Sequence, residues 1–391
     1  MAGIVQISMS MPTQGLASIA PTIQAHFHLD LVRTGLVPTS VNLGITTTML
    51  LWDFITDRVS ERWTLSLGLG GSAAFLALAA LTPGYLGVLG ALVLAGTLGS
   101  AANAGSGRAI MAWFPFNERG MALGVRQMAA PLGAGLASIV LPVVALRYGF
   151  GAALWFVAAC VGLAALAAAL FVRSPSTELE PQPPAPRAGS PLRDERLWRL
   201  TAAAALLVAT QSAFVTYLTL FLTGQVRLAI TVSAALLATV QLTGGVGRLF
   251  VGRLSDSLGH RIRLLRGLVL GGAGTMALTG LAVGLPPPLI ALLLLVGGWL
   301  LTASFGLSYA AASDMVGAAR VGTAFGLIGT VTSAGAFVGP TLFGLGVTAL
   351  GWRWGYAGLA ASSFAIWWLL RPLVGQERRA WAREEAVTRS A

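Results

Sequence analysis

The sequence predicts an all-α membrane protein of twelve transmembrane helices, arranged as two pseudo-symmetric six-helix bundles. The first reason is composition: 55% of the 391 residues are hydrophobic and only 10% are charged, whereas about a quarter of the residues in a soluble domain carry charge. The second is the length of the apolar runs, because an α-helix needs about 20 apolar residues to cross roughly 30 Å of hydrocarbon. The third is that motifs of the first half recur in the second half.

This composition narrows the class of function. A mean hydropathy of +0.78 leaves no sizeable aqueous domain, which disfavours a soluble enzyme, a nucleic-acid binder and a secreted disulfide scaffold. Cys160 is the only cysteine, so a disulfide within the chain is excluded and a thiolate metal cluster is disfavoured. We therefore expect a transporter rather than an enzyme, with no cofactor and no metal site.

Twelve apolar runs, each ended by polar residues, Gly or Pro, are expected to cross the membrane. Their approximate bounds are residues 3–25, 34–54, 63–82, 85–113, 120–146, 150–172, 199–223, 229–252, 265–285, 288–313, 321–348 and 353–375. The stretch between the sixth and seventh runs is polar and rich in proline, as in an extended linker. We expect an N-terminal bundle, a cytoplasmic linker, a C-terminal bundle and a cytoplasmic tail at residues 1–173, 174–197, 198–376 and 377–391.

The distribution of arginine predicts the orientation. All 25 basic residues are arginines, and only Arg33, Arg147, Arg227 and Arg353 fall in loops on the side opposite the N-terminus. Because an excess of basic residues marks cytoplasmic loops, we expect a multi-pass protein of the plasma (cell inner) membrane with both termini in the cytoplasm. The net charge of +11 then reflects topology and attraction to anionic membrane lipids, not a nucleic-acid partner.

Two short motifs occur in both halves at nearly the same separation. One follows the second span and again, about 199 residues later, the eighth; its residues are Asp53, Asp57, Arg58 and Arg62 in the first copy and Gly252, Asp256, Gly259 and Arg261 in the second. The other opens the fifth and eleventh spans, about 202 residues apart, as Gly120-x-Ala122-x-Gly124 and Gly322-x-Ala324-x-Gly326. Two unrelated matches at nearly one offset indicate a duplicated six-helix unit.

At these residues the chain resembles the major facilitator superfamily (MFS) of transporters. The signature of that family between spans 2 and 3 is approximately G-x-x-x-D-R-x-G-R-R. The first copy matches it at Asp57, Arg58 and Arg62, but has Asp53 and Ser60 where the signature has glycine. The resemblance implies two bundles that rock about a midplane cavity, so that one solute site faces each side of the membrane in turn.

The resemblance also implies a gating role for the boundary residues. Asp57 follows span 2 and is surrounded in sequence by guanidinium groups, and a buried acid there needs a cationic or amide partner. One interpretation is a latch that holds one conformer and opens in the other. The alternative is an ordinary interfacial ion pair that only fixes topology.

Three arginines, Arg108, Arg126 and Arg248, lie within the predicted spans. A guanidinium at the centre of a span costs roughly 2.5–3.5 kcal/mol even on insertion scales, so Arg108 and Arg126 should each face a partner, a water-filled cavity or an anion rather than lipid. No Asp or Glu lies at mid-depth in any predicted span. Arg126, together with Arg108, is therefore the candidate positive determinant of substrate binding.

The position of Arg108 also fits a structural role. Asp53 ends span 2 and Arg108 nears the end of span 4, whereas in the second copy Arg253 ends span 8 and Asp314 ends span 10, with the signs exchanged. Such an exchange favours a structural bridge from Asp53 to Arg108. A direct contact between Arg108 and substrate is the alternative.

Arg126 and Gln127 are the leading candidate ligands of a substrate. A guanidinium presents a rigid fork of donors that suits a carboxylate, and the Gln127 amide adds a donor and an acceptor. The alternative is an arginine that reaches cytoplasmic water or joins the two bundles. The following Pro131, Gly133 and Gly135 are expected to serve close helix packing.

Uncharged polar residues complete the candidate site. Because spans 1, 4, 7 and 10 line the central pathway in the superfamily, the resemblance implies substrate contacts at Gln14, Asn103, Gln211, Tyr217 and Tyr309. The sequence does not resolve which way each side chain faces. Each is equally compatible with an interhelical hydrogen bond worth about 0.6 kcal/mol.

These observations favour a monomeric secondary active transporter of a small, carboxylate-like organic anion that works by alternating access with a coupling proton or counter-anion. The alternative is a multidrug/proton antiporter. A missing mid-span carboxylate, and Leu92 where many drug/proton antiporters carry a span 4 arginine, disfavour that alternative. A sensor on the same scaffold is the third possibility, and a short C-terminal tail without a signalling domain disfavours it.

Overall fold

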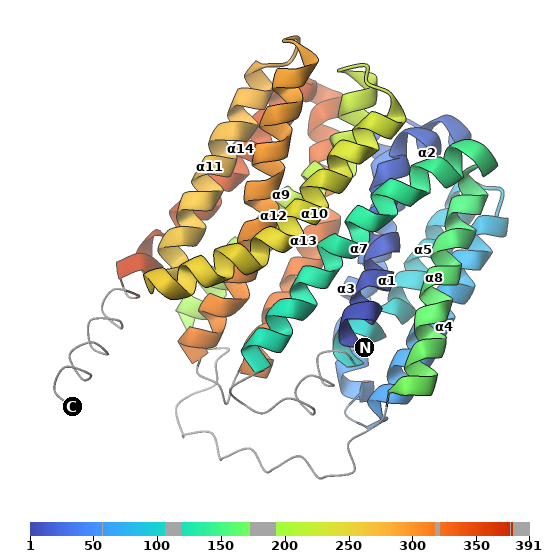
Figure 1. Cartoon of the computed structure of the whole chain (residues 1–391), viewed down its shortest axis with the longest axis horizontal. Coiled ribbons are helices and arrows are strands. Elements are labelled where there is room, and N and C mark those ends of the chain that lie inside the picture. Colours follow the sequence, from blue (N-terminus) through green and yellow to red (C-terminus); the bar gives the residue numbers. More distant parts are fainter. Residues whose placement is uncertain (57, 106–118, 173–192, 317–320, 376, 378–391) are drawn as a thin grey trace.

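The structure is a computed structural model that describes residues 1–56, 58–105, 119–172, 193–316, 321–375 and 377. Its helices run side by side in two groups, the first half of the chain on the right and the second half on the left of Figure 1. Among the described residues, ten helices are long and apolar enough to cross a membrane by length and composition. The predicted all-α membrane fold is confirmed.

The helices of the first half are α1 (Ala2–Thr13), the short 3₁₀ helix η1 (Gly15–Ile19), α2 (Ala20–Phe27), α3 (Leu31–Thr56), α4 (Glu61–Leu81), α5 (Tyr85–Gly99), α7 (Arg119–Tyr148) and α8 (Phe150–Phe171). Beyond α5, residues 101–105 are also helical. The second half contains α9 (Glu195–Gly224), α10 (Ile230–Leu258), α11 (Arg261–Leu281), α12 (Pro287–Val316), α13 (Val321–Leu350) and α14 (Trp352–Leu369).

The first predicted span, residues 3–25, is not one continuous helix. Pro12 has no backbone N–H and so removes a hydrogen bond near the end of α1. The chain then tightens into η1, where Gly15 lies against α7: a Cβ atom at Gly15 would stand 2.4 Å from the Cβ of Ala137. The interruption brings η1 close to α7, and the sequence pattern alone did not reveal it.

Each half has its own hydrophobic core. One core is formed by buried apolar residues between 5 and 172, and the other by residues between 197 and 373 together with Ala17 and Ala20. The last helix of each half begins after a glycine with positive φ, Gly149 (87°) before α8 and Gly351 (84°) before α14. These two glycines are about 202 residues apart, the same offset as the repeated motifs.

α9 begins at Glu195, about a turn earlier than the predicted span. The carboxylate of Asp194 accepts the backbone N–H of Arg196 at 2.9 Å and so caps the helix. The Arg196 side chain donates to the same carboxylate, and this hydrogen bonding holds the pKa of Asp194 below its ordinary value. The capped start lies in what we expected to be the end of the linker.

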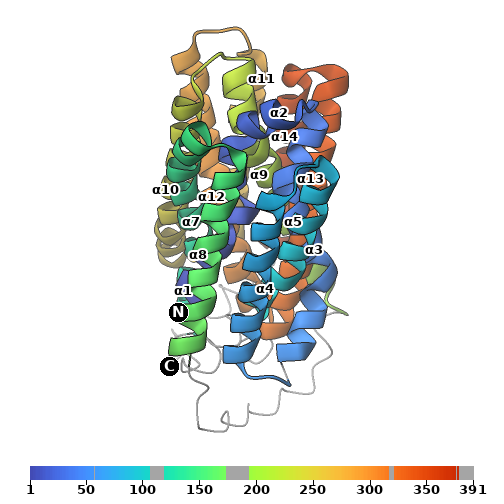
Figure 2. The same cartoon turned by 90° about the vertical axis from the view of Figure 1, so that its right-hand side faces the viewer.

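The two halves contact each other along two pairs of helices, α3 with α13 and α7 with α10. Figures 1 and 2 show the helices of these pairs running the length of the molecule. At one end the halves also meet directly: the Thr219 hydroxyl donates to the Ala17 carbonyl at 2.6 Å, and both residues are buried. The other end carries Arg58, Arg62, Arg261 and Arg263, and we call it the arginine-rich end.

Glycine permits the closest crossing within the first half. A Cβ atom at Gly96 of α5 would lie 2.0 Å from the backbone carbonyl oxygen of Val41 in α3. Because a backbone atom cannot rotate away as a side chain can, any residue larger than glycine must push the two helices apart. By contrast, a Cβ at Gly90 of the same helix would meet nothing within 4 Å.

We therefore predict that Gly96→Ala destabilises the protein and that Gly90→Ala does not. Overpacking of this kind costs about 1–3 kcal/mol, and the rigid contact places Gly96→Ala at the upper end. Thermal unfolding of the purified variants in one detergent measures the difference. Equal melting temperatures for the two variants would show that the α3–α5 crossing is looser than described.

Candidate functional site

A cavity of about 1020 Å³ lies between the two halves. Residues of α1, α3, the helical segment 101–105, α7, α9, α10, α12 and α13 line it. The lining reaches Thr56 at the end of α3 and Gly322 at the start of α13, both at the arginine-rich end. Because the opposite end is closed by the Thr219–Ala17 contact, the cavity is directed toward the arginine-rich end.

The structure brings most of the sequence-predicted substrate residues to this one cavity. Six of them line it, namely Gln14, Asn103, Arg126, Gln127, Gln211 and Tyr309. Arg108 lies outside the described residues.

Tyr217 lies elsewhere, although we expected it in the pathway. Its side chain is 1% exposed, and its ring packs beside Phe343 with centroids 5.2 Å apart. The hydroxyl lies over Gly35 of α3 and Gly344 of α13, where Cβ atoms would come within 2.0 and 2.1 Å of it. Tyr217 therefore helps to pack the closed end against both halves, and we leave it out of the candidate site.

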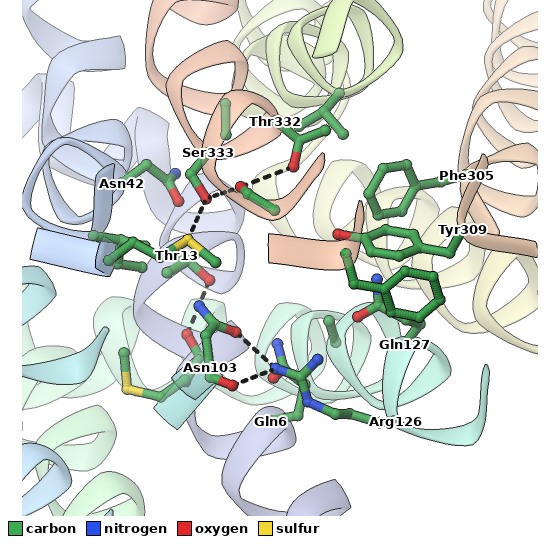
Figure 3. A pocket seen from close by; sticks show the side chains of 18 of the residues that line it. Gln6, Thr13, Asn42, Asn103, Arg126, Gln127, Phe305, Tyr309, Thr332 and Ser333 are labelled. Atoms are coloured by element: carbon green, nitrogen blue, oxygen red, sulfur yellow. Dashed lines mark hydrogen bonds between the residues drawn. The ribbon is translucent and has the colours of Figure 1, made fainter. Parts of the chain in front are cut away.

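Arg126 lies in the fifth predicted span and is held by Asn103 of the fourth. It projects from α7 toward residues 101–105, and its Nη2 donates to the backbone carbonyl and the side-chain Oδ1 of Asn103 at 3.2 and 3.1 Å (Figure 3). Both residues lie on the cavity wall. The guanidinium thus has a fixed position at the cavity surface rather than in lipid.

Arg248 is the site residue that the sequence interpretation missed. It extends from α10, and its Nε donates to the Thr302 carbonyl at 2.9 Å while Nη1 donates to the Gln127 carbonyl at 2.5 Å. The guanidinium also lies over the Phe305 ring, 5.2 Å from the centroid. A charge within a span is as costly at Arg248 as at Arg126, so the sequence did indicate that Arg248 needs a partner. The sequence did not indicate which side of the helix Arg248 faces.

The cavity has two different walls. On the second half, Phe305, Tyr309 and Phe325 form a chain of edge-to-face rings with centroids 5.3 and 4.8 Å apart. On the first half the lining includes the polar side chains of Gln6, Thr13, Gln14, Asn42 and Asn103 beside apolar ones such as Met9 and Ile45. Among the described lining residues the charged side chains are Arg126 and Arg248, with no Asp or Glu. The described lining therefore combines positive charge with an aromatic surface.

A hydrogen bond between two amide side chains joins the halves at α10. The Gln241 amide of α10 donates to the Gln14 Oε1 at 2.8 Å, and Gln241 is fully buried. Gln14 stands where α1 gives way to η1, so the interrupted helix places this amide at the interface. We expected Gln14 to contact the substrate, but in this structure its side-chain oxygen contacts the other half.

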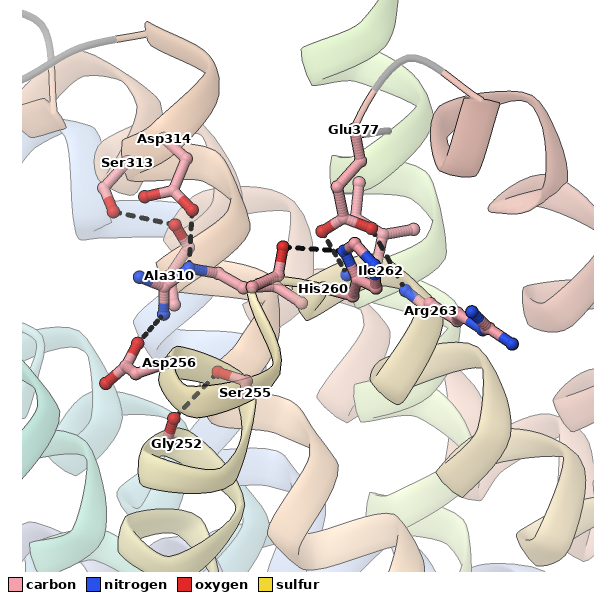
Figure 4. Close-up of polar contacts among 12 residues, drawn as sticks. Gly252, Ser255, Asp256, His260, Ile262, Arg263, Ala310, Ser313, Asp314 and Glu377 are labelled. Carbon is pink, nitrogen blue, oxygen red and sulfur yellow. Dashed lines mark hydrogen bonds and ion pairs between the residues drawn. The ribbon is translucent and has the colours of Figure 1, made fainter. Parts of the chain in front are cut away.

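The second copy of the boundary motif forms an ion-pair network at the arginine-rich end (Figure 4). Arg261 pairs with Asp256 at 2.8 Å and also donates to Asp314 of α12. Gly259 has a φ of 65° and lets α10 end before α11 begins. The partner that the structure shows for Asp314 is thus Arg261, and not the Arg253 that the exchange of charges suggested.

A residue after the last helix supports the same corner. Glu377 accepts the backbone N–H of Ile262 at 2.9 Å, at the start of α11 where helix amides lack partners. Ser255 donates to the Gly252 carbonyl one turn back in α10. The motif residues of the second copy are therefore tied to α10, α11, α12 and the C-terminal segment together.

The first copy of the motif is described only in part. Asp57 lies outside the described residues, and the Asp53 side chain is likewise not described. Arg58 lies over the Phe54 ring at 4.0 Å, and Arg62 lies 5.9 Å from the Trp63 ring. The Asp57 latch and the Asp53–Arg108 bridge both remain predictions.

Two helical bundles around a cavity with buried polar and cationic walls define a multi-pass membrane transporter. Residues 2–298 match the model of the Major Facilitator Superfamily. The chain belongs to this superfamily, as the boundary motifs indicated. It is a transporter and not an enzyme.

Two relatives and one solved structure show how far the likeness extends. The chain is 32% identical over 383 residues to an uncharacterized MFS-type transporter of Mycobacterium tuberculosis, a match that covers 96% of this chain and 84% of that protein. It is 26% identical over 146 residues to the fosmidomycin resistance protein of Escherichia coli, covering 37% of this chain and 36% of that protein.

The solved structure is a bacterial homolog of the human lysosomal transporter Spinster in an inward-facing and unoccupied conformation. It matches with a TM-score of 0.69 at 15% identity, covering 96% of this chain and 95% of that chain. At this identity the match shows the shared fold alone. It supports the two-bundle architecture and carries no information about substrate.

The direction of the cavity predicts a pattern of chemical labelling. In a Cys160→Ala background, a cysteine at Ala336 on the cavity wall should react with a water-soluble maleimide, whereas a cysteine at Ala20, which is 0% exposed at the closed end, should react far more slowly. Labelling rates of the purified variants measure this. Faster labelling at Ala20 would indicate that the solution conformer is open at the opposite end.

Proposed function

We propose that this protein is a secondary active transporter of a small, carboxylate-like organic anion. The observation that carries the proposal is a cavity between the halves that holds one arginine from each half, Arg126 and Arg248, and no acidic residue among its described lining. A cavity with this charge attracts anions and repels cations, and the field is strong because the walls exclude water.

The chemistry of the lining fits a carboxylate in particular. Guanidinium groups donate in a fixed fork that matches the two oxygens of a carboxylate, and such charge-assisted hydrogen bonds are shorter and stronger than neutral ones. The amides of Gln127 and Asn103 offer further donors nearby. The aromatic wall formed by Phe305, Tyr309 and Phe325 offers a surface for an apolar body. We infer that Arg126, Gln127, Asn103, Gln211 and Tyr309 contact the substrate.

Alternating access is the mechanism that we propose. Residues 1–173 and 198–376 act as the two moving units, joined by the linker, in a plasma-membrane protein with both termini in the cytoplasm. The cavity directed to the arginine-rich end, and the contact between Thr219 and Ala17 at the other end, support an inward-facing conformer. Reversal of these contacts opens the opposite end. The ion pairs of Arg261 with Asp256 and Asp314 serve as a gate at the inner end.

Two kinds of coupling fit a cavity with this lining. A proton crosses on the carboxyl group of the substrate itself, or the substrate exchanges for a counter-anion that uses the same arginines. In both cases the ligand compensates the charge of the arginines, and no protein carboxylate is needed. The protein then works as a monomer, because the cavity lies within one chain.

A multidrug/proton antiporter is the second candidate. The aromatic wall and lining residues such as Met9, Ile45 and Val208 favour a lipophilic substrate. The partial similarity to the fosmidomycin resistance protein of Escherichia coli points to a role in drug resistance. The two candidates differ in the charge of the ligand that binds.

A thermal-shift screen separates the two candidates. We predict that organic carboxylates raise the apparent melting temperature of the purified protein and that lipophilic cations do not, because a ligand that binds only the native state stabilises it by mass action. Benzoate, succinate, inorganic phosphate and tetraphenylphosphonium form the panel. Stabilisation by the cation alone would support the drug antiporter and contradict the anion carrier.

The fork of donors on Arg126 predicts a result that charge alone does not. Arg126→Lys keeps the charge but loses the paired donors, so the affinity for a stabilising carboxylate should fall roughly tenfold or more. Arg147→Lys, at the exposed end of the same helix, is the matched control and should bind as the wild type does. Titration of the thermal shift gives both affinities. Unchanged binding in Arg126→Lys would remove Arg126 from the site.

A further inference from the structure

A proline in α7 leaves a backbone carbonyl without its helical donor. In an α-helix the N–H of each residue bonds to the carbonyl four residues earlier. Pro131 has no N–H, so the carbonyl of Gln127 lacks that partner. In a membrane such a carbonyl must be satisfied by another group, because unpaired backbone groups are costly away from water.

Arg248 supplies the missing donor from the other half of the molecule. Its Nη1 donates to the Gln127 carbonyl, while its Nε donates to the Thr302 carbonyl on its own side. Pro131 itself lies at this interface, since a Cβ atom at Gly245 of α10 would stand 3.1 Å from the proline ring. The hydrogen bond therefore joins the two halves at one defined point between α7 and α10.

At the equivalent position of the α3–α13 interface, the two helices cross in the same way without a charged residue. By the offsets of the repeated motifs, Arg248, Gln127 and Pro131 correspond to Met49, Gly329 and Ser333. Met49 of α3 packs there against α13: a Cβ at Gly329 would stand 2.8 Å from its terminal methyl, and the Ser333 hydroxyl lies 3.8 Å from its sulfur. Packing of the halves thus does not require an arginine, and the charge of Arg248 calls for another explanation.

We propose that Arg248 is a second ligand of the transported anion, and that the anion takes the place of the Gln127 carbonyl. This inference rests on the proposed function. The guanidinium lies on the cavity wall, and a carboxylate oxygen is a stronger acceptor for it than a neutral carbonyl. Arg126, Arg248 and Tyr309 line the same cavity, and the Phe305 ring that lies under the Arg248 guanidinium packs edge-to-face against Tyr309. A ligand beside Tyr309 is therefore placed to meet both arginines.

The exchange links binding to movement of the halves. In the empty protein the Arg248–Gln127 hydrogen bond holds α7 against α10 in the conformer described here. An anion that accepts from Arg248 releases this direct tie, while Thr302 and Phe305 keep the guanidinium on its own half. The empty protein is therefore held, and the occupied protein is free to reorient.

Two substitutions test the exchange because they change opposite partners of the same hydrogen bond. Pro131→Ala restores an N–H that competes for the Gln127 carbonyl and frees Arg248. Arg248→Gln removes the charge itself. Pro142→Ala, a second proline within α7, and Arg253→Gln, an exposed arginine on α10, are the matched controls.

The first measurement needs no ligand. In the Cys160→Ala, Ala20→Cys background, both Pro131→Ala and Arg248→Gln should speed maleimide labelling of the closed-end cysteine, by about tenfold for a hydrogen bond of the strength usual for a charged donor. Neither control should change the rate. A wild-type labelling rate in both test variants would show that the hydrogen bond does not hold the conformer, and the inference would fail whether or not the protein carries anions.

The second measurement is the affinity for benzoate, succinate and phosphate, from the thermal shift. Pro131→Ala should bind the stabilising anion more tightly than the wild type and Arg248→Gln should bind it at least tenfold more weakly. Weaker binding in both variants would overturn the exchange. If no anion stabilises the wild type, the proposed function is contradicted. The labelling rates still decide, independently, whether the Arg248–Gln127 hydrogen bond holds the conformer. Melting temperatures without ligand identify a variant that is merely misfolded.

Discussion

The requirement that polar groups inside a membrane be satisfied by the protein itself shapes this molecule more than any other constraint. Hydrocarbon offers no hydrogen bonds, so every carbonyl, amide and guanidinium within the spans must find a partner or a water-filled space. Arg248 and the Gln127 carbonyl satisfy this requirement for each other. The guanidinium carries a charge that lipid cannot solvate, and the carbonyl lacks its helical donor because of Pro131.

Close packing supplies the second part of the structure. Helices in lipid gain little from burying apolar surface, so they associate through tight contacts that small residues permit. Gly15, Gly96 and Gly133 each allow such a contact, and a Cβ at Gly133 would stand 2.4 Å from the Ile7 carbonyl. The expected packing role of the segment that follows Arg126 is thereby confirmed at Gly133. The same principle closes the far end, where Tyr217 fits between glycines of both halves.

The architecture could be predicted from the sequence because it depends on the lengths and spacing of segments along the chain. Run lengths give the helices, and a constant offset gives the duplication. Direction around a helix is different: each residue turns the side chain by about 100°, and helices that are apolar on nearly every face give no stripe from which to read their orientation. Tyr217 and Arg248 were therefore the residues whose surroundings could not be deduced. The partner of Asp314 was also missed, because the path of a loop decides which arginine reaches it.

The duplicated halves also explain why a site can arise at one interface without disturbing the fold. Two equivalent crossings, α3 with α13 and α7 with α10, use the same backbone geometry, so each can accept different side chains as long as the volume is preserved. The α3–α13 crossing uses the flexible thioether of Met49, which adapts to a neighbour that moves. The α7–α10 crossing uses a charged hydrogen bond, which is either formed or broken. A ligand shifts the populations of two conformers only through a contact that differs between them. The α7–α10 hydrogen bond is such a contact, whereas the α3–α13 packing adapts to both conformers. Binding at the α7–α10 interface can therefore act on the equilibrium between the conformers.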